Sequence, residues 1–581
     1  MEDLPFHPLF GIIIAILILC GIVLLGQKIL TKLGQQKSFV LALCLGMLLI
    51  SQTLYILILN KITLLVIYPT ALCLMLMGII YLFINRPLVF TAKNAWRDRS
   101  PNLMHDPVYI LSVSLMIAYV LLSFAPPTNA DALDYHWGIP VYLLRHQEWP
   151  PTYLWKTASV GGIGEVFNTL GVALYAENLG TILQSLSLVA FSCYLANRHN
   201  SSKRRFLLLY ILSSPVLLFL VTTPKPQLFP QVMTALALYL TVSEKDIDKK
   251  RFFLICCLLM GAAQQKLSFI MTGGLIGLWA FWKASRNTKF VFTIGMMCFV
   301  FFFLPRGIWN LEQTFNQGLI SFFSPLPIEY LNSLHMYREN NFWFPINLFV
   351  PESLGKMSTI IGFQILLIVF VRTKNKKFWE VITLTFLGML ATILFGMSVG
   401  RAFYEFVLWT AVAFSFLPEE DFRFRLYNRF LYFQGLVVFG GAAFGVFYLF
   451  PGVLSEEKRQ EVMHRSAWQY SAVTWANKVL PENTVVLSGF RSVSLLTHDF
   501  VPTDWLSHIE LNKKYFDAIK LKKPNFLVVN GAMKGLDGCA GEKYAGPKTF
   551  KSATRNPFNA GKEYFVIIYH FDASLLPSCK R

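Results

Sequence analysis

The chain has 581 residues, 55% of them hydrophobic and 15% aromatic, and its mean hydropathy is +0.50. A soluble globular protein of this length rarely reaches such values, and many apolar runs approach the ~20 residues that a helix needs to cross a bilayer. The runs are continuous rather than alternating, which favours a bundle of spanning helices over a barrel.

The first apolar run follows "MEDLPFHPLF", which has no basic residues, so we expect a retained helix rather than a cleaved signal peptide. About fourteen crossings of bilayer-spanning type are predicted. They cover 9–27, 39–59, 62–84, 107–125, 179–196, 206–221, 228–243, 252–264, 267–283, 289–305, 357–371, 381–398, 402–417 and 430–450. The glycine-rich run 160–176 is expected to be interfacial or re-entrant.

Lysine and arginine are distributed unequally between alternate loops, and cytoplasmic loops are normally the richer ones. The loops near 28–37, 86–99, 198–205, 245–251, 283–289, 372–377 and 423–429 are strongly basic. The alternate loops hold few cations, namely Lys61, Arg145, Lys156, Lys225, Lys266, Arg306, Arg338, Lys356 and Arg401. The net charge of +19 is therefore an orientation signal rather than a nucleic-acid footprint, and we expect both termini outside.

The first long outer loop, 126–178, opens with "PPTNADALDYHWGIP" and places Asp131, Asp134 and His136 close together. From Asp131 onward the apolar residues have helical spacing, and the rings of Trp137 and Tyr142 suit a helix on the membrane surface. Asp131 could cap that helix, which is the structural alternative to a chemical role. Asp134 and His136 could equally be solvated interface residues.

Four cations lie at outer helix ends, where the charge rule makes cations rare. They are Lys225 in "TTPKPQLFPQ", Lys266 in "AAQQKLSF", Arg306 in "PRGIWN" and Arg401 in "SVGRAFYEF". Any one of them could merely snorkel to the interface, and the prolines beside Lys225 could simply separate two helices. Together they could converge on one anion beside Asp131.

Residues 306–356 form a second long outer loop, rich in asparagine, aromatic residues and proline, and longer than a connection requires. The tail, 455–581, is expected to be a small soluble α/β domain. Its strand candidates are "NTVVLSGF", "PNFLVVNG" and "EYFVIIYHF", with a helix candidate at "IELNKKYFDAIKLKK". Cys539 and Cys579 lie in this tail and are expected to form a disulfide, with two free thiols as the alternative.

The order of these motifs resembles the GT-C superfamily of membrane glycosyltransferases, in particular the polyprenyl-phosphate-sugar-dependent mannosyl- and aminoarabinosyl-transferases. The matching stretches are "PPTNADALDYHWGIPVYLL", "PKPQ", "QQKLSF", "PRGIWNLEQTFNQG" and "GRAFYEF", over residues 105–417. The resemblance implies that Asp131 is the catalytic base, with Asp134 as a second candidate. It also implies a lipid-linked donor, whose phosphate Lys225, Lys266, Arg306 and Arg401 would bind. The candidates for binding acceptor or sugar are Tyr135, His136, Glu165, Asn310 and Glu312.

The predicted protein is thus an α-helical polytopic membrane protein with a GT-C-like core and a small α/β C-terminal soluble domain. Its expected parts are an N-terminal extension, 1–104, a catalytic core, 105–454, and the domain 455–581. We expect an inverting transfer of sugar from a polyprenyl-phosphate donor to a lipid, glycan or protein acceptor, at the outer face of a bacterial inner membrane. No metal or other cofactor is expected. The alternative is a transporter or flippase of lipid-linked envelope precursors, which would place its charges near the bilayer midplane.

Overall fold

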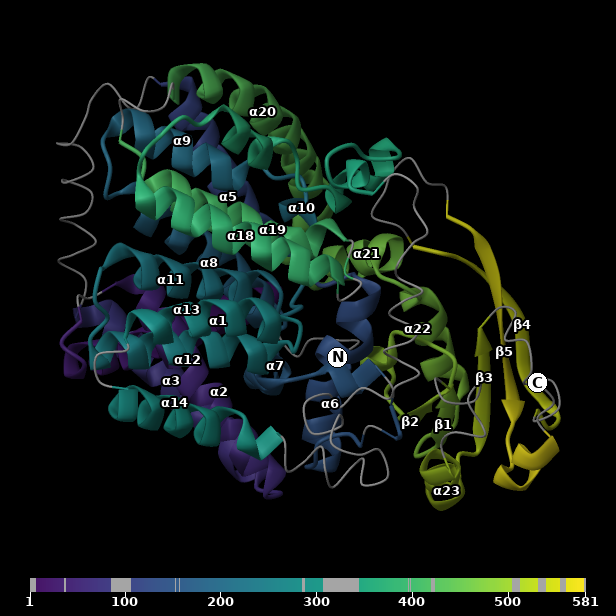
Figure 1. Ribbon diagram of the computed structural model, residues 1–581. Helices are drawn as coiled ribbons and strands as arrows, with labels where there is room; N and C mark the ends of the chain where they lie inside the picture. The colour runs from purple at the N-terminus through teal and green to yellow at the C-terminus, as the bar shows by residue number, and fades with distance from the viewer. Residues whose placement is uncertain are drawn as a thin grey trace.

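The computed structural model describes residues 7–35, 38–84, 106–151, 153–155, 157–284, 288–306, 344–394, 397, 399–418, 424–503, 513–530, 540–553 and 561–578. Helices fill most of this part of the chain, and a small sheet follows near the C-terminus (Figure 1). The predicted fold class, a helical membrane protein with a C-terminal α/β domain, is confirmed. Seven of the described helices are long and apolar enough to cross a membrane.

The chain begins with three antiparallel apolar helices, α1 (Pro8–Lys32), α2 (Phe39–Leu59) and α3 (Thr63–Ile84). Glycines allow their backbones to approach closely, as is common between membrane helices. A Cβ added to Gly21 would lie 2.1 Å from the carbonyl oxygen of Leu74, and one added to Gly46 would lie 2.1 Å from that of Ile22. The three helices therefore form one tightly packed unit.

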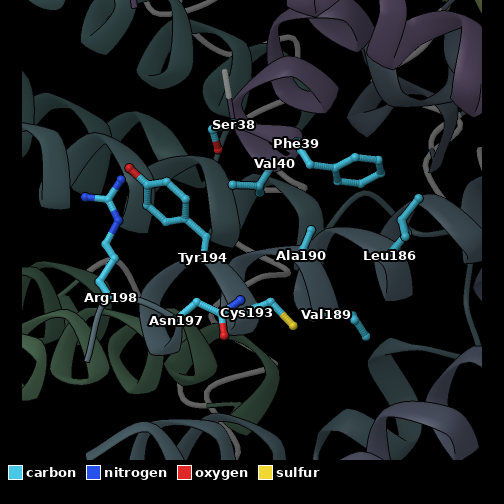
Figure 2. A pocket seen from close by; sticks show the side chains of 10 residues that line it. All are labelled: Ser38, Phe39, Val40, Leu186, Val189, Ala190, Cys193, Tyr194, Asn197 and Arg198. Atoms are coloured by element: carbon cyan, nitrogen blue, oxygen red, sulfur yellow. The ribbon is translucent and has the colours of Figure 1, made fainter. Parts of the chain in front are cut away.

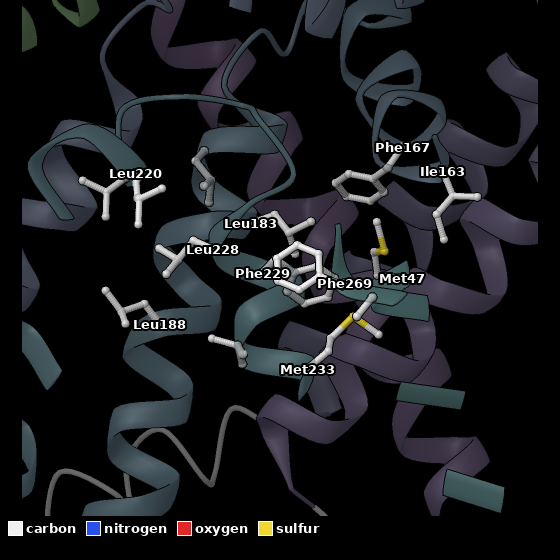
Figure 3. Close-up of a cluster of buried hydrophobic side chains, with 14 of the residues drawn as sticks. Met47, Ile163, Phe167, Leu183, Leu188, Leu220, Leu228, Phe229, Met233 and Phe269 are labelled. Atoms are coloured by element: carbon white, nitrogen blue, oxygen red, sulfur yellow. The ribbon is translucent and has the colours of Figure 1, made fainter. Parts of the chain in front are cut away.

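The remaining apolar helices build the larger bundle. They are α5 (Pro107–Phe124), α8 (Leu179–Ala196), α9 (Ser201–Leu212), α10 (Leu217–Leu220), α11 (Leu228–Ser243), α12 (Lys249–Gln265), α13 (Phe269–Lys283), α14 (Thr288–Phe302), α18 (Lys376–Leu394), α19 (Gly400–Ser415) and α20 (Phe424–Leu449). Large side chains from several of them meet in one buried cluster (Figure 3). Phe167, Phe229 and Met233 are among its fully buried members.

Two of the expected crossings differ in the structure. The run 357–371 is not a spanning helix, because two short 3₁₀ helices, η7 (Leu354–Thr359) and η8 (Gln364–Phe370), occupy it. The run 206–221 is divided into α9 and the one-turn helix α10, with Pro215 between them. Apolar composition predicted both runs as crossings, but it does not report the backbone breaks.

The first outer loop folds as a short π-helix, η2 (Ala132–His136), which continues into α6 (Trp137–His146). A 3₁₀ turn, η3 (Thr157–Val160), and the buried helix α7 (Ile163–Ala173) follow. Trp137 and Tyr142 are almost fully buried, so they do not form the membrane-surface belt expected from the sequence. The neighbouring C-terminal domain covers this segment instead, as the contacts between them show.

The C-terminal domain starts with α21 (Glu456–Ser466) and α22 (Tyr470–Val479), which follow the 3₁₀ turn η9 (Phe450–Val453). Its five strands are β1 (Val485–Ser488), β2 (Asp499–Pro502), β3 (Phe526–Asn530), β4 (Lys543–Lys551) and β5 (Glu563–His570), in the order β2-β1-β3-β5-β4. β1 pairs in parallel with β2 and β3, whereas β5 pairs antiparallel with β3 and β4. The three predicted strands and the predicted helix, α23 (Lys513–Lys522), are confirmed.

Short 3₁₀ helices complete the described elements, namely η6 (Ile346–Leu348), η10 (Val493–Leu495) and η12 (Ala573–Ser578). The segment around η10 connects the C-terminal domain to the first outer loop. Ser494 Oγ donates to the carbonyl oxygen of Leu133 at 2.7 Å, and the backbone N–H of Trp468 donates to that of Thr128 at 3.2 Å. A buried ion pair between Arg459 and Glu177, 2.8 Å, adds a third attachment. The domain is therefore docked on the loop that carries Asp131.

Candidate active site

Asp131 lies at the centre of a charged cluster between the helical bundle and the C-terminal domain. Its Oδ2 accepts from Lys225 Nζ at 2.9 Å, and its Oδ1 accepts from Arg491 Nη2 at 2.7 Å. Lys225 comes from the turn between α10 and α11, and Arg491 comes from the segment after β1. One carboxylate is thus bound by two cations from parts of the chain that are far apart in sequence.

The backbone at Asp131 explains why its carboxylate is available for these contacts. Asp131 precedes the π-helix η2, yet its side chain caps no backbone N–H. Asn129 performs a similar local role, since its Oδ1 accepts from the backbone N–H of Asp131 at 3.0 Å. The capping interpretation of Asp131 is therefore wrong. A π-helical turn inside a helical segment is frequent at functional sites.

The charges around Asp131 determine its ionisation. Burial alone would raise the pKa of its carboxyl group, but Lys225, His136 and Arg491 together hold that pKa well below its usual range. Burial and the nearby charge of Arg401 lower the pKa of Lys225 to about 8, although the Asp131 carboxylate acts to raise it. At neutral pH the pair is therefore an aspartate and a lysine ammonium.

Lys266 and Arg401 extend the positive charge beyond Lys225. Burial lowers the pKa of Lys266 well below its ordinary value, and the charges of Lys225 and Arg401 lower it further. Lys266 Nζ donates to Gln227 Oε1, and Arg401 packs with its guanidinium carbon 5.9 Å from the ring centre of Phe219. Among the described residues neither cation has a carboxylate partner. Of the four cations predicted to converge beside Asp131, Lys225, Lys266 and Arg401 lie close enough to influence one another's charge.

Asp134, the second candidate base, is buried and held by hydrogen bonds. Trp155 Nε1 and Thr157 Oγ1 donate to its Oδ1 at 3.3 and 3.2 Å. Arg491 Nε lies 3.6 Å from its Oδ2. Asp134 is thus held in place beside Arg491, whereas the Asp131 side chain is partly exposed, at 24%.

His136 and Glu165 form a buried pair next to this cluster. His136 Nδ1 lies 2.6 Å from Glu165 Oε1, and the backbone N–H of Gly162 donates to Glu165 Oε2 at 2.6 Å. Both carboxylate oxygens of Glu165 are therefore engaged, and its clearest role is to orient His136 and the start of α7. Burial lowers the pKa of His136 although Glu165 opposes the change, and His136 Nε2 has no hydrogen-bond partner in the described part of the chain.

Arg306 lies in the same region, but its guanidinium binds backbone carbonyl oxygens rather than a carboxylate. Its Nη1 donates to the carbonyl oxygen of Gln264 at 3.1 Å, and its Nη2 donates to that of Gly161 at 2.8 Å. A Cβ on Gly162 would lie 2.2 Å from the Gln264 oxygen and 2.9 Å from Arg306 Nη1, so glycine is required for this close approach. In this conformation Arg306 ties α7 to the end of α12.

Several predicted residues cannot be placed, and one important residue was missed. Asn310, Glu312, Cys539 and Cys579 lie outside the described residues, so their predicted roles remain untested. Tyr135 is buried in the π-helix beside His136, with ring centres 4.0 Å apart. Arg491 was not predicted, because "SGFRSVS" contains no local signal that would distinguish it from an ordinary surface turn.

Two cavities lie in different parts of the bundle, and only one of them borders a residue of the charged cluster. One of about 340 Å³ borders Arg401 and Phe219 and includes Asn347, Ser358 and Thr359. The other, about 490 Å³, lies between the start of α2 and the end of α8, where Tyr194 and Arg198 line it together with Phe39 (Figure 2). The second lies among the basic loops and away from Asp131. In the described residues no group of three His, Cys, Asp or Glu side chains is placed to hold a metal ion.

The fold and this site define a multi-pass helical membrane protein with a polar, cation-rich centre covered by its C-terminal domain. The chain belongs to the DUF1420 family: the model of the DUF1420 N-terminal domain matches residues 88–463, and that of the DUF1420 C-terminal domain matches residues 464–581. Among curated proteins, none matches the chain.

Two similar solved structures are of ArnT from Cupriavidus metallidurans. The one bound to undecaprenyl phosphate has a TM-score of 0.47 at 12% identity, over 78% of this chain and 96% of that chain. The apo structure has a TM-score of 0.40 at 12% identity, over 80% of this chain and 98% of that chain.

Proposed function

We propose that the protein is a membrane glycosyltransferase that moves a sugar from a polyprenyl-phosphate-linked donor to an acceptor hydroxyl. The site would face the outer side of a bacterial inner membrane. The observation that carries the proposal is the pairing of Asp131 with Lys225, beside the further cations Lys266 and Arg401. A carboxylate next to surplus cations suits a reaction that removes one proton and releases one anion.

The cations suit the leaving group. When the bond between the sugar and the phosphate breaks, the phosphate leaves with the electron pair as a stable anion, so it needs positive charge rather than a proton. Lys225, Lys266 and Arg401 would provide that charge in a largely buried setting, where electrostatic interactions are stronger than in water. The cavity beside Arg401 offers space for the sugar or for part of the acceptor.

Asp131 suits the other half of the reaction. The acceptor hydroxyl is a poor nucleophile until a base takes its proton, and a positioned base typically contributes ~10²–10⁴-fold to the rate. As the donor phosphate attracts Lys225, the Asp131 carboxylate would become more basic at the moment when it is needed. Attack on the side opposite the phosphate would invert the anomeric centre.

Binding of undecaprenyl phosphate to the purified protein tests the anion site. We expect saturable binding that weakens at least about tenfold when Lys225 and Arg401 are both replaced by methionine, because two charges near one phosphate are lost. The matched control is Lys203→Met, since Lys203 is bonded to backbone carbonyls at the other end of the bundle. Equal binding by all three proteins would contradict a donor-phosphate site at these cations.

A further inference from the structure

Arg491 is the residue through which the C-terminal domain reaches the candidate active site. Its backbone is held in place, because its N–H donates to Gln469 Oε1 at 2.8 Å and the adjacent Ser492 Oγ donates to the carbonyl oxygen of Trp468. Two residues further on, Ser494 is bonded to the carbonyl oxygen of Leu133 inside the π-helix. The segment 491–494 is therefore fixed against the segment that carries Asp131 and Asp134.

The contacts of the Asp131 carboxylate raise a chemical problem. Its Oδ2 is bonded to Lys225 and its Oδ1 to Arg491, so both oxygens are in charge-assisted hydrogen bonds. A base must present an oxygen to the acceptor hydroxyl. Each oxygen keeps a second lone pair for the acceptor hydroxyl, but a carboxylate in contact with two cations is a weak base. Withdrawal of one cation would uncover an oxygen and strengthen the base.

Arg491 is the cation that can withdraw. Lys225 is buried, with an exposed fraction of 4%, whereas the Arg491 side chain is 49% exposed and carries its charge on a long flexible stem. A second carboxylate also lies within reach, since Arg491 Nε is already 3.6 Å from Asp134 Oδ2. Trp155 and Thr157 hold that carboxylate in position.

We propose that Arg491 is a positioning residue that alternates between Asp131 and Asp134, so that the C-terminal domain controls access to the base. At rest it covers Asp131 Oδ1. When an acceptor hydroxyl enters, Arg491 moves fully onto Asp134 and Oδ1 becomes free. Asp134 is then the fixed second partner of Arg491 rather than a base.

The movement of Arg491 does not change the reaction step. Its role rests on the glycosyl transfer proposed above. The acceptor O–H bond breaks and its proton goes to Asp131 Oδ1, while the acceptor oxygen forms a bond to the anomeric carbon. The bond from that carbon to the donor phosphate oxygen breaks, and its electron pair stays on the phosphate. Arg491 on Asp134 leaves Asp131 with one cation fewer, which makes it a stronger base.

Kinetics of the full-length protein test the proposal through pH dependence and coupling. In Arg491→Gln the acid limb of kcat/KM moves to higher pH, because Asp131 has lost a cation. Asp134→Asn leaves Arg491 without its second partner and lowers kcat. In the double variant kcat returns to the level of Arg491→Gln alone, so the two changes are non-additive by at least about threefold, as expected for contacting residues. The control is Lys478→Gln, an exposed lysine of α22.

A second measurement needs no glycosyl transfer. In Asp131→Cys, the rate of thiol alkylation against pH reports the ionisation of the new thiol, which Arg491 should favour. Adding Arg491→Gln should shift that profile to higher pH, whereas adding Lys478→Gln should not. Unchanged alkylation profiles, or kcat losses that simply multiply, would overturn the role of Arg491. An absence of sugar transfer in the unaltered protein, with the alkylation shift still present, would instead count against the proposed function.

Discussion

Charged side chains lie at both ends of the helical bundle, but their interaction partners differ between the two ends. At the basic end, defined here by Lys203, Lys283 and Lys377, each of these cations has a local structural partner. Lys203 Nζ donates to the carbonyl oxygens of Ser415 and Leu417, each at 2.6 Å, where α19 ends. Lys283 pairs with Glu380 at 2.8 Å, and Lys377 donates to the carbonyl oxygen of Ser243.

At the site end, defined by Asp131 and its neighbours, cations outnumber the carboxylates that face them. Lys225 and Arg491 share Asp131, while Lys266 and Arg401 have no carboxylate partner among the described residues. Lysines that cap helix carbonyls stabilise a helix end and need no ligand. Partly buried cations without a carboxylate partner destabilise the folded protein until an anion binds beside them. The contrast supports the proposal that the charge cluster around Asp131 binds the donor phosphate.

The orientation of the two ends can be tested first, because the expected result is all or none. A cysteine replacing the exposed Tyr175 should react with a membrane-impermeant thiol reagent from outside the cell, and one replacing Lys245 should react only after permeabilisation. The reason is the excess of lysine and arginine in the loops near Lys245. The reverse labelling pattern would place the candidate site on the cytoplasmic side and contradict the proposed use of an outer acceptor.

The largest graded effect is expected at Asp131. Asp131→Asn preserves shape but removes the base, so we expect transfer to fall by about 10²-fold or more. Membrane insertion should be unchanged, whereas the thermal stability of the purified protein should fall, because the buried Lys225 loses its carboxylate partner. If turnover remained near normal, Asp131 would not be the proton acceptor.

A smaller effect distinguishes the cations at the two ends. Lys266→Met should weaken donor binding several-fold while leaving acceptor affinity little changed, because Lys266 carries surplus charge at the site end. Lys283→Met should lower stability without changing donor affinity, since its partner is Glu380. Isothermal titration calorimetry with undecaprenyl phosphate would detect the loss of binding, and thermal unfolding would detect the loss of stability. Similar stability losses with no change in binding would show that Lys266 is structural.

The smallest effect is a pH dependence that comes from Lys225. Its pKa is lowered to about 8, so the ammonium is present below that pH and is lost as the pH rises through it. Donor affinity should therefore decline above about pH 8. Lys225→Arg keeps its charge to much higher pH and should remove the decline. A pH-independent affinity in the unaltered protein would mean that the charge of Lys225 does not contribute to binding.

Much of the site could be predicted from the sequence, because its signals are local. Asp131 follows an apolar run directly, and Lys225, Lys266 and Arg401 stand at the ends of other apolar runs on the face where cations are rare. Their convergence required only that those helix ends lie at one end of a bundle. The strands β1, β3 and β5 were equally visible as short β-rich runs with turn residues after them.

Other features depend on long-range packing that one sequence does not encode locally. Arg491 lies 360 residues after Asp131 and becomes a site residue only because the C-terminal domain docks on the first outer loop. β2, "DFVP", is very short and contains a proline, and β4, "KYAGPKTFK", is largely polar, so neither has the pattern of a buried strand. The run 357–371 is apolar enough for a crossing, but its backbone forms 3₁₀ turns.

We propose that the protein takes its sugar from a polyprenyl-phosphate-linked donor and that Asp131 is the base. Lipid mass spectrometry tests this proposal most directly. Total lipids would be compared between cells that lack the protein, cells that produce it, and cells that produce Asp131→Asn at equal levels. We expect a polyprenyl-phosphate-linked sugar to accumulate, and a glycosylated acceptor to be missing, both without the protein and with Asp131→Asn. Identical lipid-linked sugars and acceptors in all three samples would contradict the account.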